Sequence, residues 1–311
     1  MISKRNNVSK ISIIIPTSLK RKNQLLNLIT SLNKQILDRK LYEIIIIINN
    51  AKNIDFGFLR NLKIDQTIID NDISGPGPAR NLGSRNAHGD ILVFTDDDCI
   101  PQSDWLFVVW HAFINENIDY LSGEILPQRK NKYTLLEMYI ILSGFLRDPI
   151  KVNGNVVCIP TANLAIRTEV FNQIGGFDER INTVGGEDTD LTYRLMKSGF
   201  IYQHNPKFKT YHNHNIDLLH HCKRWYYYGM GVKMHIVIRR ESNIYGLIIS
   251  ESLFGLLKNF GEIVTYSKVQ FGKEYSKTLP LSVRLIFHFY AFVREFFYQL
   301  GAINYKKRSN L

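Results

Sequence analysis

The stretch Ile91-Leu-Val-Phe-Thr-Asp-Asp-Asp-Cys99 decides how this sequence can fold. Its first residues are mostly apolar and predict a buried strand, and three consecutive carboxylates, Asp96, Asp97 and Asp98, follow directly. Ligands of open α/β sheets bind at the carboxyl ends of strands, so we expect the three acids at such an edge. Adjacent carboxylates repel one another unless a cation offsets their charge. The stretch therefore indicates either a site for Mg²⁺ or Mn²⁺ or a solvated acidic turn.

The segments before this stretch predict a parallel sheet. Residues 11–15 and 43–50 are apolar and rich in isoleucine, as buried strands are, and residues 66–69 predict a shorter strand. Between the first two runs, leucine and isoleucine recur at helical spacing over residues 22–36. A strand, a helix and a strand in this order form a βαβ unit, which places the chain in the α/β class.

A glycine- and proline-rich turn precedes a predicted helix over residues 79–89, and Arg80 lies in the first turn of that helix. A cation there opposes the helix dipole. Its position is explained if Arg80 faces an anion that the helix N-terminus also attracts. The alternative is an ordinary solvated arginine.

After the acid triplet, we expect a helix over residues 101–114 and an edge strand over 119–126. The polar segment 127–155 surrounds an apolar stretch and is a candidate for a loop that closes over a substrate. A further strand, 156–160, and a helix from Thr168 complete this part of the chain.

A second acid cluster follows two glycines, in Gly185-Gly-Glu-Asp-Thr-Asp190. Leu191, Leu195 and Met196 predict a helix whose N-terminus carries these acids, where negative charge is favourable. One acid would be enough to cap the helix. The presence of more acids than the helix needs therefore favours a general base among them, and simple capping of the helix is the alternative. Further on, His212 and His214 alternate so that both imidazoles can face one side.

Composition limits the class of protein. The chain has 311 residues, of which 45% are hydrophobic and 22% are charged, as in ordinary globular proteins. Three cysteines without metal-ligand spacing argue against a disulfide framework and predict a reducing compartment. We recognise neither a signal peptide nor an apolar run long enough to span a membrane, so we expect a cytoplasmic protein.

The net charge of +11 is concentrated in the last third of the chain. Residues 216–311 hold 14 Lys and Arg but only 6 Asp and Glu, so they predict a second, helical region with an anionic partner. Residues 244–257 and 279–300 are apolar with few charges, and Arg284, His288 and Glu295 share one helical face, with Arg294 and Tyr298 beside it. Lys306-Lys-Arg308 follows. We expect this region to lie on the inner face of the cell membrane; a packed helical cap and a dimer interface are the alternatives.

The ordered segments SIIIPT, EIIIIINN, GPARNLGSRNAHGDILVFTDDDC, NLAIRTEVFNQIGGFDE, GGEDTDLTYRL and YHNH together resemble the family 2 glycosyltransferases of the GT-A fold. The resemblance covers roughly residues 10–215, which are expected to form the catalytic domain. It implies a mostly parallel, Rossmann-like sheet flanked by helices. It also implies transfer of a sugar, with inversion, from a nucleotide diphosphate that a divalent metal ion holds.

Carried over to this sequence, the resemblance assigns roles to particular residues. Asp96 and Asp98 match the metal and nucleotide motif DxD, with Asp97 in its variable middle place. Glu187 and Asp188 match a catalytic pair in which Asp188 is the base. The residues expected at the nucleotide are Pro16, Thr17, Asn49, Arg80, Asp96 and Asp97, and those expected at the metal are Asp96, Asp98 and His212 or His214.

The sequence departs from the family pattern in two places. Asn49 stands where a base-binding aspartate is common, which weakens the assignment of a UDP-sugar as donor. A Tyr-Asn pair after Pro-Thr is replaced by Ser18-Leu19, with the basic residues Lys20, Arg21 and Lys22 behind it.

The expected activity is therefore transfer from a nucleotide sugar to a saccharide or a polyprenyl-linked saccharide in the synthesis of cell-surface polysaccharide. Nucleotidyl transfer is disfavoured because no glycine-rich phosphate loop follows the first strand. A non-catalytic basic module for nucleic acid or an anionic membrane is the alternative from another class, but no nucleic-acid-binding signature supports a nucleic-acid partner. A catalytically inactive homologue is disfavoured by the presence of both acid pairs.

Overall fold

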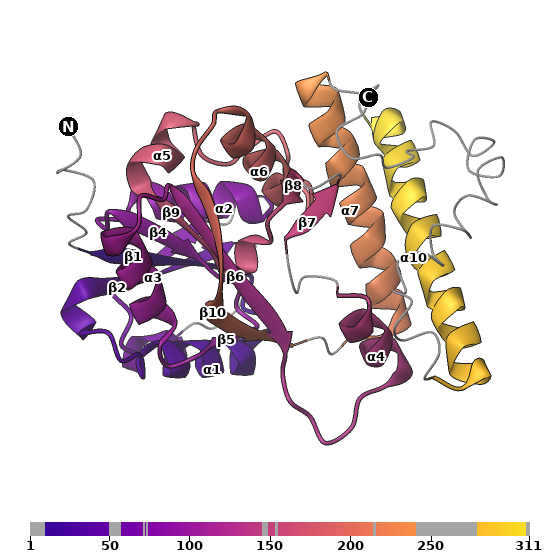
Figure 1. Cartoon of the computed structure of the whole chain (residues 1–311), viewed down its shortest axis with the longest axis horizontal. Coiled ribbons are helices and arrows are strands. Elements are labelled where there is room, and N and C mark those ends of the chain that lie inside the picture. Colours follow the sequence, from indigo (N-terminus) through magenta and orange to yellow (C-terminus); the bar gives the residue numbers. More distant parts are fainter. Residues whose placement is uncertain are drawn as a thin grey trace. The chain divides into compact units, whose positions relative to one another are not determined.

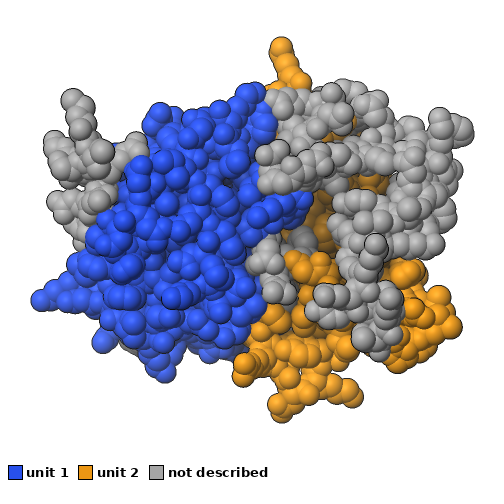
Figure 2. Space-filling view, in the orientation of Figure 1, with its two compact units in different colours: residues 1–126, 147–182, 188–213 blue, residues 127–146, 183–187, 214–311 orange. Residues whose placement is uncertain are grey.

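The computed structural model (Figure 1) describes residues 10–49, 57–70, 72, 74–144, 149–152, 155–213, 216–240 and 279–308. The predicted apolar segment 244–257 and His214 lie outside these residues, and the side chains of residues 306–308 are likewise not described. The chain forms two compact units, coloured in Figure 2. Unit 1 comprises residues 1–126, 147–182 and 188–213, and unit 2 comprises 127–146, 183–187 and 214–311. The predicted second domain, 216–311, thus falls within unit 2, which also takes two short segments from the predicted catalytic domain.

Unit 1 is built on an eight-stranded mixed sheet with the order β3-β2-β1-β4-β9-β6-β10-β5. Strands β1, β2, β3 and β4 are parallel, whereas β9 runs antiparallel to β4, β6 to β9, and β5 to β10. The strands are β1 (Ile11–Thr17), β2 (Tyr42–Asn49), β3 (Gln66–Asp70), β4 (Ile91–Phe94), β5 (Cys99–Pro101), β6 (Tyr120–Pro127), β9 (Leu164–Arg167) and β10 (Tyr202–His212). A separate hairpin pairs β7 (Ile150–Val152) with β8 (Asn155–Cys158).

The isoleucine-rich strands are buried on both faces because helices cover each side of the sheet. Alternate residues of β1 enter different cores: Ile13 and Ile15 pack with helix α1 (Lys22–Leu32) and helix α3 (Trp105–Asn115), and Ile14 packs with helix α2 (Pro76–Arg85). The side of α2 also carries α5 (Thr168–Gln173) and α6 (Glu187–Lys197). This arrangement confirms the expected α/β sheet.

Two local expectations are wrong. The strand predicted at the sheet edge is β6, and it lies between β9 and β10. Its two neighbours in the sheet come from parts of the chain far away in the sequence, which alternation within one strand does not reveal. The helix predicted from Pro101 begins instead at Trp105, because residues 99–101 form β5 and pair with β10.

Helix α2 lies unusually close to the sheet. A Cβ atom at Gly83 would approach the Ile47 Cδ1 atom to 2.5 Å and the Ile14 Cγ2 atom to 2.7 Å, so a larger residue there would require these two side chains to move. The helix begins after Gly75, whose φ of +87° is in the region that favours glycine. This close packing fixes the first turn of α2, and with it Arg80, near the carboxyl ends of β1 and β4.

Unit 2 contains the helices α4 (Leu135–Leu142), α7 (Leu218–Arg239) and α10 (Leu281–Arg308). Leu136, Tyr139 and Ile140 of α4 pack with Phe287 and Ala291 of α10. Helix α4 starts with a capping box formed by Thr134 and Glu137 and occupies the apolar stretch that was predicted inside an irregular segment. No helix among the described residues is long and apolar enough to cross a membrane.

Helices α7 and α10 approach each other through glycines. A Cβ atom at Gly229 would lie 1.7 Å from the Tyr298 carbonyl oxygen, and one at Gly301 would lie 1.8 Å from that of Tyr226. Arg294, expected beside a polar outer face, is buried, with its guanidinium 5.4 Å from the centre of the Trp225 ring. The large side chains that α10 exposes are instead Leu281, Leu285 and Phe289. The described part of α10 is therefore a packed helix with an apolar outer side.

Candidate active site

The acid triplet lies where β4 ends, beside the end of β1. Ile14 pairs with Phe94, so the two parallel strands bring Thr17 and residues 95–98 to the same edge of the sheet. The chain then turns, with the Cys99 amide donating to the Asp96 carbonyl at 3.1 Å. Asp97 and Asp98 are each only 3% exposed. Two of the three acids are therefore buried in unit 1, so the triplet is not a solvated acidic turn.

Each acid of the triplet has a different partner. The Arg80 Nη2 atom lies 2.7 Å from Asp96 Oδ1. Thr17 Oγ1 donates to Asp97 Oδ2 at 2.6 Å, and Arg21 Nη2 lies 3.0 Å from Asp97 Oδ1. Arg21 also pairs with Asp98 through its Nη1 atom. Two guanidinium groups are thus shared among three carboxylates.

These contacts set the protonation of the triplet. Burial raises the pKa of Asp97 to about 6; Arg21 and the hydroxyl of Thr17 oppose this rise, and the charges of Asp98 and Asp96 add to it. Burial would also raise the pKa of Asp96, but the charges of Arg80 and His212 outweigh it and lower that pKa. Asp97 was expected in the variable middle place of the motif. Its hydrogen bond from Thr17 connects the end of β1 to the segment that follows β4.

Strand β10 brings His212 to the triplet. The antiparallel pairing of β10 with β5 places His212 opposite Cys99, and its Nε2 atom lies 3.3 Å from Asp98 Oδ1. The amide of Asn213 donates to the Asp98 carbonyl at 3.2 Å. His212 is 4% exposed. The predicted metal ligands Asp98 and His212 therefore lie together.

The third predicted metal ligand, Asp96, pairs with an arginine. Asp96 faces Arg80, and no cluster of three His, Cys, Asp or Glu side chains suited to a metal ion forms within the described part of the chain. The carboxylate of Asp98 and the imidazole of His212 are nevertheless a donor pair that suits Mn²⁺ or Mg²⁺. The residues present fit a metal ion with two protein ligands, where a bound diphosphate would supply further oxygens.

The expected nucleotide-binding residues lie at the same sheet edge. Pro16 and Thr17 end β1, and Thr17 pairs with Ile48, one residue before Asn49. Asn49 ends β2 and is partly exposed. These residues share the edge because the carboxyl ends of neighbouring parallel strands meet there, and their binding of a nucleotide stays a prediction.

Asp188, the expected base, is the second residue of α6. Its Oδ1 atom accepts a hydrogen bond from the Thr189 amide at 2.8 Å. Burial raises the pKa of Asp188; the charge of Arg80 lowers it, and that of Asp96 raises it further. In the sequence, Glu187 and Asp190 are near enough to raise the pKa of Asp188 as well, but the main contributions come from burial, the Thr189 amide, Arg80 and Asp96. Asp190 is instead bound by Arg194, whose Nε atom lies 2.7 Å from its Oδ2 atom, and Glu187 is a buried residue at the start of the helix.

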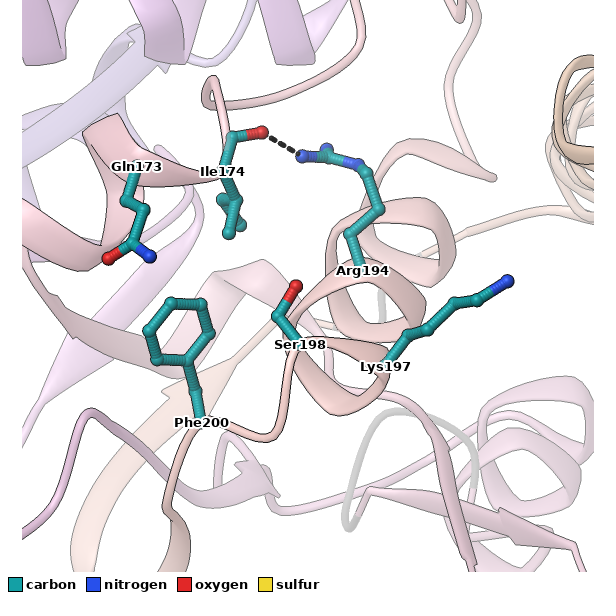
Figure 3. Close-up of a pocket in the computed structure, with 6 residues that line it drawn as sticks. All are labelled: Gln173, Ile174, Arg194, Lys197, Ser198 and Phe200. Carbon is teal, nitrogen blue, oxygen red and sulfur yellow. Dashed lines mark hydrogen bonds between the residues drawn. The ribbon is translucent and has the colours of Figure 1, made fainter.

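Arg194 lines a pocket elsewhere in unit 1, at the other end of α6 (Figure 3). Its guanidinium donates to the carbonyls of Ile174 at 2.8 Å and Gly176 at 2.6 Å, and thereby ties the Gly-Gly turn to α6. The cavity of about 210 Å³ is lined by Gln173, Ile174, Arg194, Lys197, Ser198 and Phe200. None of the expected catalytic residues lines it.

Sequence reasoning missed Arg21 as a site residue. Its signal was the basic run 20–22 at a place where the sequence departs from the family pattern. Arg21 lies at the start of α1, where its carbonyl accepts from the amides of Gln24 and Leu25 at 3.0 Å. A loop residue at this position faces the same sheet edge as the triplet.

Comparison with known proteins agrees with this geometry. Residues 12–175 match the family described as glycosyl transferase family 2, and residues 149–220 match the N-terminal domain of galactosyltransferase. The chain belongs to glycosyl transferase family 2. The region that matches this family, residues 12–175, contains nearly all of the parallel half of the sheet, Arg80 and the acid triplet, whereas Asp188 and His212 fall in the second matched region.

Relatives in this family share the same part of the chain. The pre-mycofactocin glycosyltransferase of Mycobacterium tuberculosis is 28% identical over 181 residues, which are 57% of this chain and 38% of the relative. Glycosyltransferase AglE of Haloferax volcanii is 26% identical over 196 residues, covering 61% and 62% of the two chains. The chain thus spans between about two fifths and three fifths of the length of these relatives.

Solved structures establish the fold. The mannosyltransferase PcManGT from Pyrobaculum calidifontis, in complex with GDP-Man and Mn²⁺, has a TM-score of 0.62 at 13% identity, with 96% of this chain and 87% of that one covered. TarS 1–349 of S. aureus has a TM-score of 0.53 at 17% identity over 96% and 92% of the two chains. The GT-A fold expected from the sequence is confirmed.

Proposed function

We propose that this glycosyl transferase family 2 protein transfers a sugar, with inversion, from a nucleotide-diphosphate donor to an acceptor hydroxyl. The observation that carries the proposal is the acid edge: three carboxylates, two arginines and His212 gathered at the ends of β1, β4 and β10. Solved relatives of the same fold contain GDP-Man with Mn²⁺ or UDP-GlcNAc, which supports a nucleotide sugar as the donor class.

The donor is proposed to bind along the edge formed by Pro16, Thr17 and Asn49. Arg80 is 2% exposed and paired with Asp96, so it provides a fixed positive charge at this edge. A divalent ion held by Asp98 and His212 would neutralise the leaving diphosphate. Asn49 can accept a hydrogen bond from a base through its side-chain carbonyl, so UDP is the first nucleotide to test and GDP the second.

Asp188 is proposed to remove the proton from the acceptor hydroxyl. Its carboxylate lies at the N-terminus of α6 and senses the charges of Arg80 and Asp96, which supports a position close to the donor. The raised pKa makes Asp188 a stronger base than an ordinary aspartate once it is ionised. Departure of the diphosphate and attack by the deprotonated oxygen on the opposite face of the anomeric carbon then give inversion.

The acceptor is proposed to be a saccharide or a polyprenyl-linked saccharide used in cell-surface polysaccharide synthesis. The exposed Leu281, Leu285 and Phe289 of α10, together with the basic composition of residues 216–311, support attachment to an anionic membrane at its cytoplasmic side. Flotation with vesicles that contain phosphatidylglycerol tests this part. Equal binding to neutral phosphatidylcholine vesicles would argue against an anionic surface as the partner, and binding to neither would argue for a homo-oligomer through this region.

The activity is tested by incubating the purified chain with UDP-, GDP- and dTDP-sugars in the presence of Mn²⁺ or Mg²⁺ and measuring release of the nucleoside diphosphate. We expect one donor to be consumed, with the reaction stopped by EDTA. If no donor is consumed and the protein binds nucleic acid tightly, the alternative of a basic binding module is supported instead.

A further inference from the structure

Arg21 and Arg80 neutralise the same acid triplet in different ways. Arg80 is enclosed: its side chain is 3% exposed and lies 5.6 Å from the centre of the Phe177 ring. The side chain of Arg21 is 48% exposed although it contacts both Asp97 and Asp98. A half-exposed arginine can leave its partners by rotating about side-chain bonds, whereas an enclosed one cannot do so without moving its surroundings.

The backbone beneath Arg21 is fixed. The Leu19 amide donates to Thr17 Oγ1 at 3.0 Å, and Leu19 is itself 4% exposed with a φ of +58°. On the other side, the carbonyl of Arg21 accepts the first hydrogen bonds of α1. Any exchange of partners is therefore confined to the Arg21 side chain, which remains tethered next to the triplet.

Arg21 occupies the carboxylate that a metal ion needs. It pairs with Asp98 Oδ2, and the other oxygen of Asp98 faces His212. A divalent ion at Asp98 and His212 would lie a few ångströms from the guanidinium, and two positive groups at such a distance repel each other. The ion and the Arg21 guanidinium therefore compete for Asp98.

We propose that Arg21 is an exchangeable counter-cation: its guanidinium neutralises Asp97 and Asp98 while the site holds no donor, and it transfers to the donor's diphosphate when a divalent ion binds at Asp98. Only the second half of this inference, the transfer of the guanidinium to the diphosphate, rests on the proposed function. The planar guanidinium suits a diphosphate, because it donates two parallel hydrogen bonds to phosphate oxygens. The exchange couples the arrival of the metal ion to that of the nucleotide.

The test measures two affinities that move in opposite directions. MnCl₂ is titrated into the full chain without nucleotide, and free Mn²⁺ is followed by electron paramagnetic resonance. We expect Arg21→Ala to bind Mn²⁺ at least about tenfold more tightly than the unaltered chain, because it has lost the competing cation. In saturating Mn²⁺, calorimetry with UDP and GDP should show about tenfold weaker nucleotide binding by the same variant.

Lys20→Ala is the matched control, because Lys20 is an exposed cation next to Arg21 in the same loop. Lys20→Ala should change both affinities less than about twofold, because salt screens the charge of an exposed side chain. Arg21→Gln keeps the first three side-chain carbons and a polar end but loses the charge, and it serves if Arg21→Ala does not fold; it should show the same opposite shifts.

Unchanged or weaker Mn²⁺ binding by both Arg21 variants would overturn the inference, as would a lack of Mn²⁺ binding by every protein. A parallel loss of both affinities would show a merely structural role and would also overturn it. If the unaltered chain binds Mn²⁺ but neither nucleotide, the proposed function fails, while the Mn²⁺ titration still decides whether Arg21 competes for Asp98.

Discussion

Both ends of the parallel strands in unit 1 contain buried carboxylates, but the groups that surround these carboxylates differ between the two ends. At the amino end, Glu43 is 2% exposed and is the acceptor for several groups. Its Oε1 atom accepts from Ser12 Oγ at 2.5 Å and the His88 amide at 2.7 Å, and its Oε2 atom lies 3.3 Å from Lys10 Nζ and 3.2 Å from His88 Nδ1. At the carboxyl end, three carboxylates share two guanidinium groups, a hydroxyl and an imidazole.

The pKa shifts follow this difference. Burial would raise the pKa of Glu43, but hydrogen bonds from Ser12 and His88 and the charge of Lys10 outweigh it, so the pKa is lowered from 4.5. At the carboxyl end, burial raises the pKa of Asp97, and it also raises that of Asp188 at the start of α6, whereas the charges of Arg80 and His212 keep the pKa of Asp96 lowered. A buried acid whose acceptor capacity is filled by protein donors holds the fold together, whereas crowded acids with raised pKa values mark a place for a ligand.

The largest effect that tests this contrast is expected for Asp188→Asn. The substitution keeps the size of the side chain but removes the base, so kcat for sugar transfer should fall by about 10³-fold. Binding of the nucleotide sugar, measured by calorimetry, should stay within about twofold, because the acid edge is intact. Transfer by the variant at a rate near that of the unaltered protein would show that Asp188 is not the base.

The next effect is one of stability, from a matched pair of substitutions. Glu43→Gln weakens the charge-assisted hydrogen bonds from Ser12 and His88 and should lower the free energy of unfolding by about 2 kcal/mol without changing kcat. Asp97→Asn removes a buried charge whose ionisation is already disfavoured, so it should cost less than Glu43→Gln. Urea unfolding measures both. If Asp97→Asn lowered the free energy of unfolding as much as Glu43→Gln or more, the proposed difference between the two ends would be contradicted.

The smallest effect is the pH dependence of Glu43. Because its pKa is lower in the folded chain than in the unfolded chain, its stabilising contribution is present above pH 4.5 and is lost as the pH falls through the folded value. The difference in unfolding free energy between the unaltered protein and Glu43→Gln should therefore be constant from pH 7 to 6 and shrink below about 4.5. A difference that grows on acidification would contradict the assignment.

The sequence was informative where structure is local and repetitive. The isoleucine runs predicted β1 and β2, and the rule that parallel strands end at one edge brought Thr17, Asn49 and the acid triplet together. Local patterns could not show that β6 is an internal strand, because its neighbours β9 and β10 come from distant parts of the chain.

The same limit applies to the candidate site. The acids were recognisable as a cluster, but their individual partners depend on tertiary contacts: Thr17 reaches Asp97 across 80 positions, and Arg21 reaches Asp98 across 77. The surplus acid Asp190 likewise gained its role only from Arg194 and the turn that Arg194 binds. Residue type predicted where charge gathers, and only the folded chain assigned each charge a partner.

The central claim is that the acid edge binds a nucleotide diphosphate together with a divalent ion. Its most direct test is the thermal unfolding of the unaltered protein and of Asp98→Asn with UDP or GDP, each with and without Mn²⁺. We predict that Mn²⁺ and one nucleotide together raise the Tm of the unaltered protein by several degrees, roughly what binding at 100 times Kd gives, and leave that of Asp98→Asn almost unchanged. An equal rise in the variant, or no rise with either nucleotide in the unaltered protein, would contradict the claim.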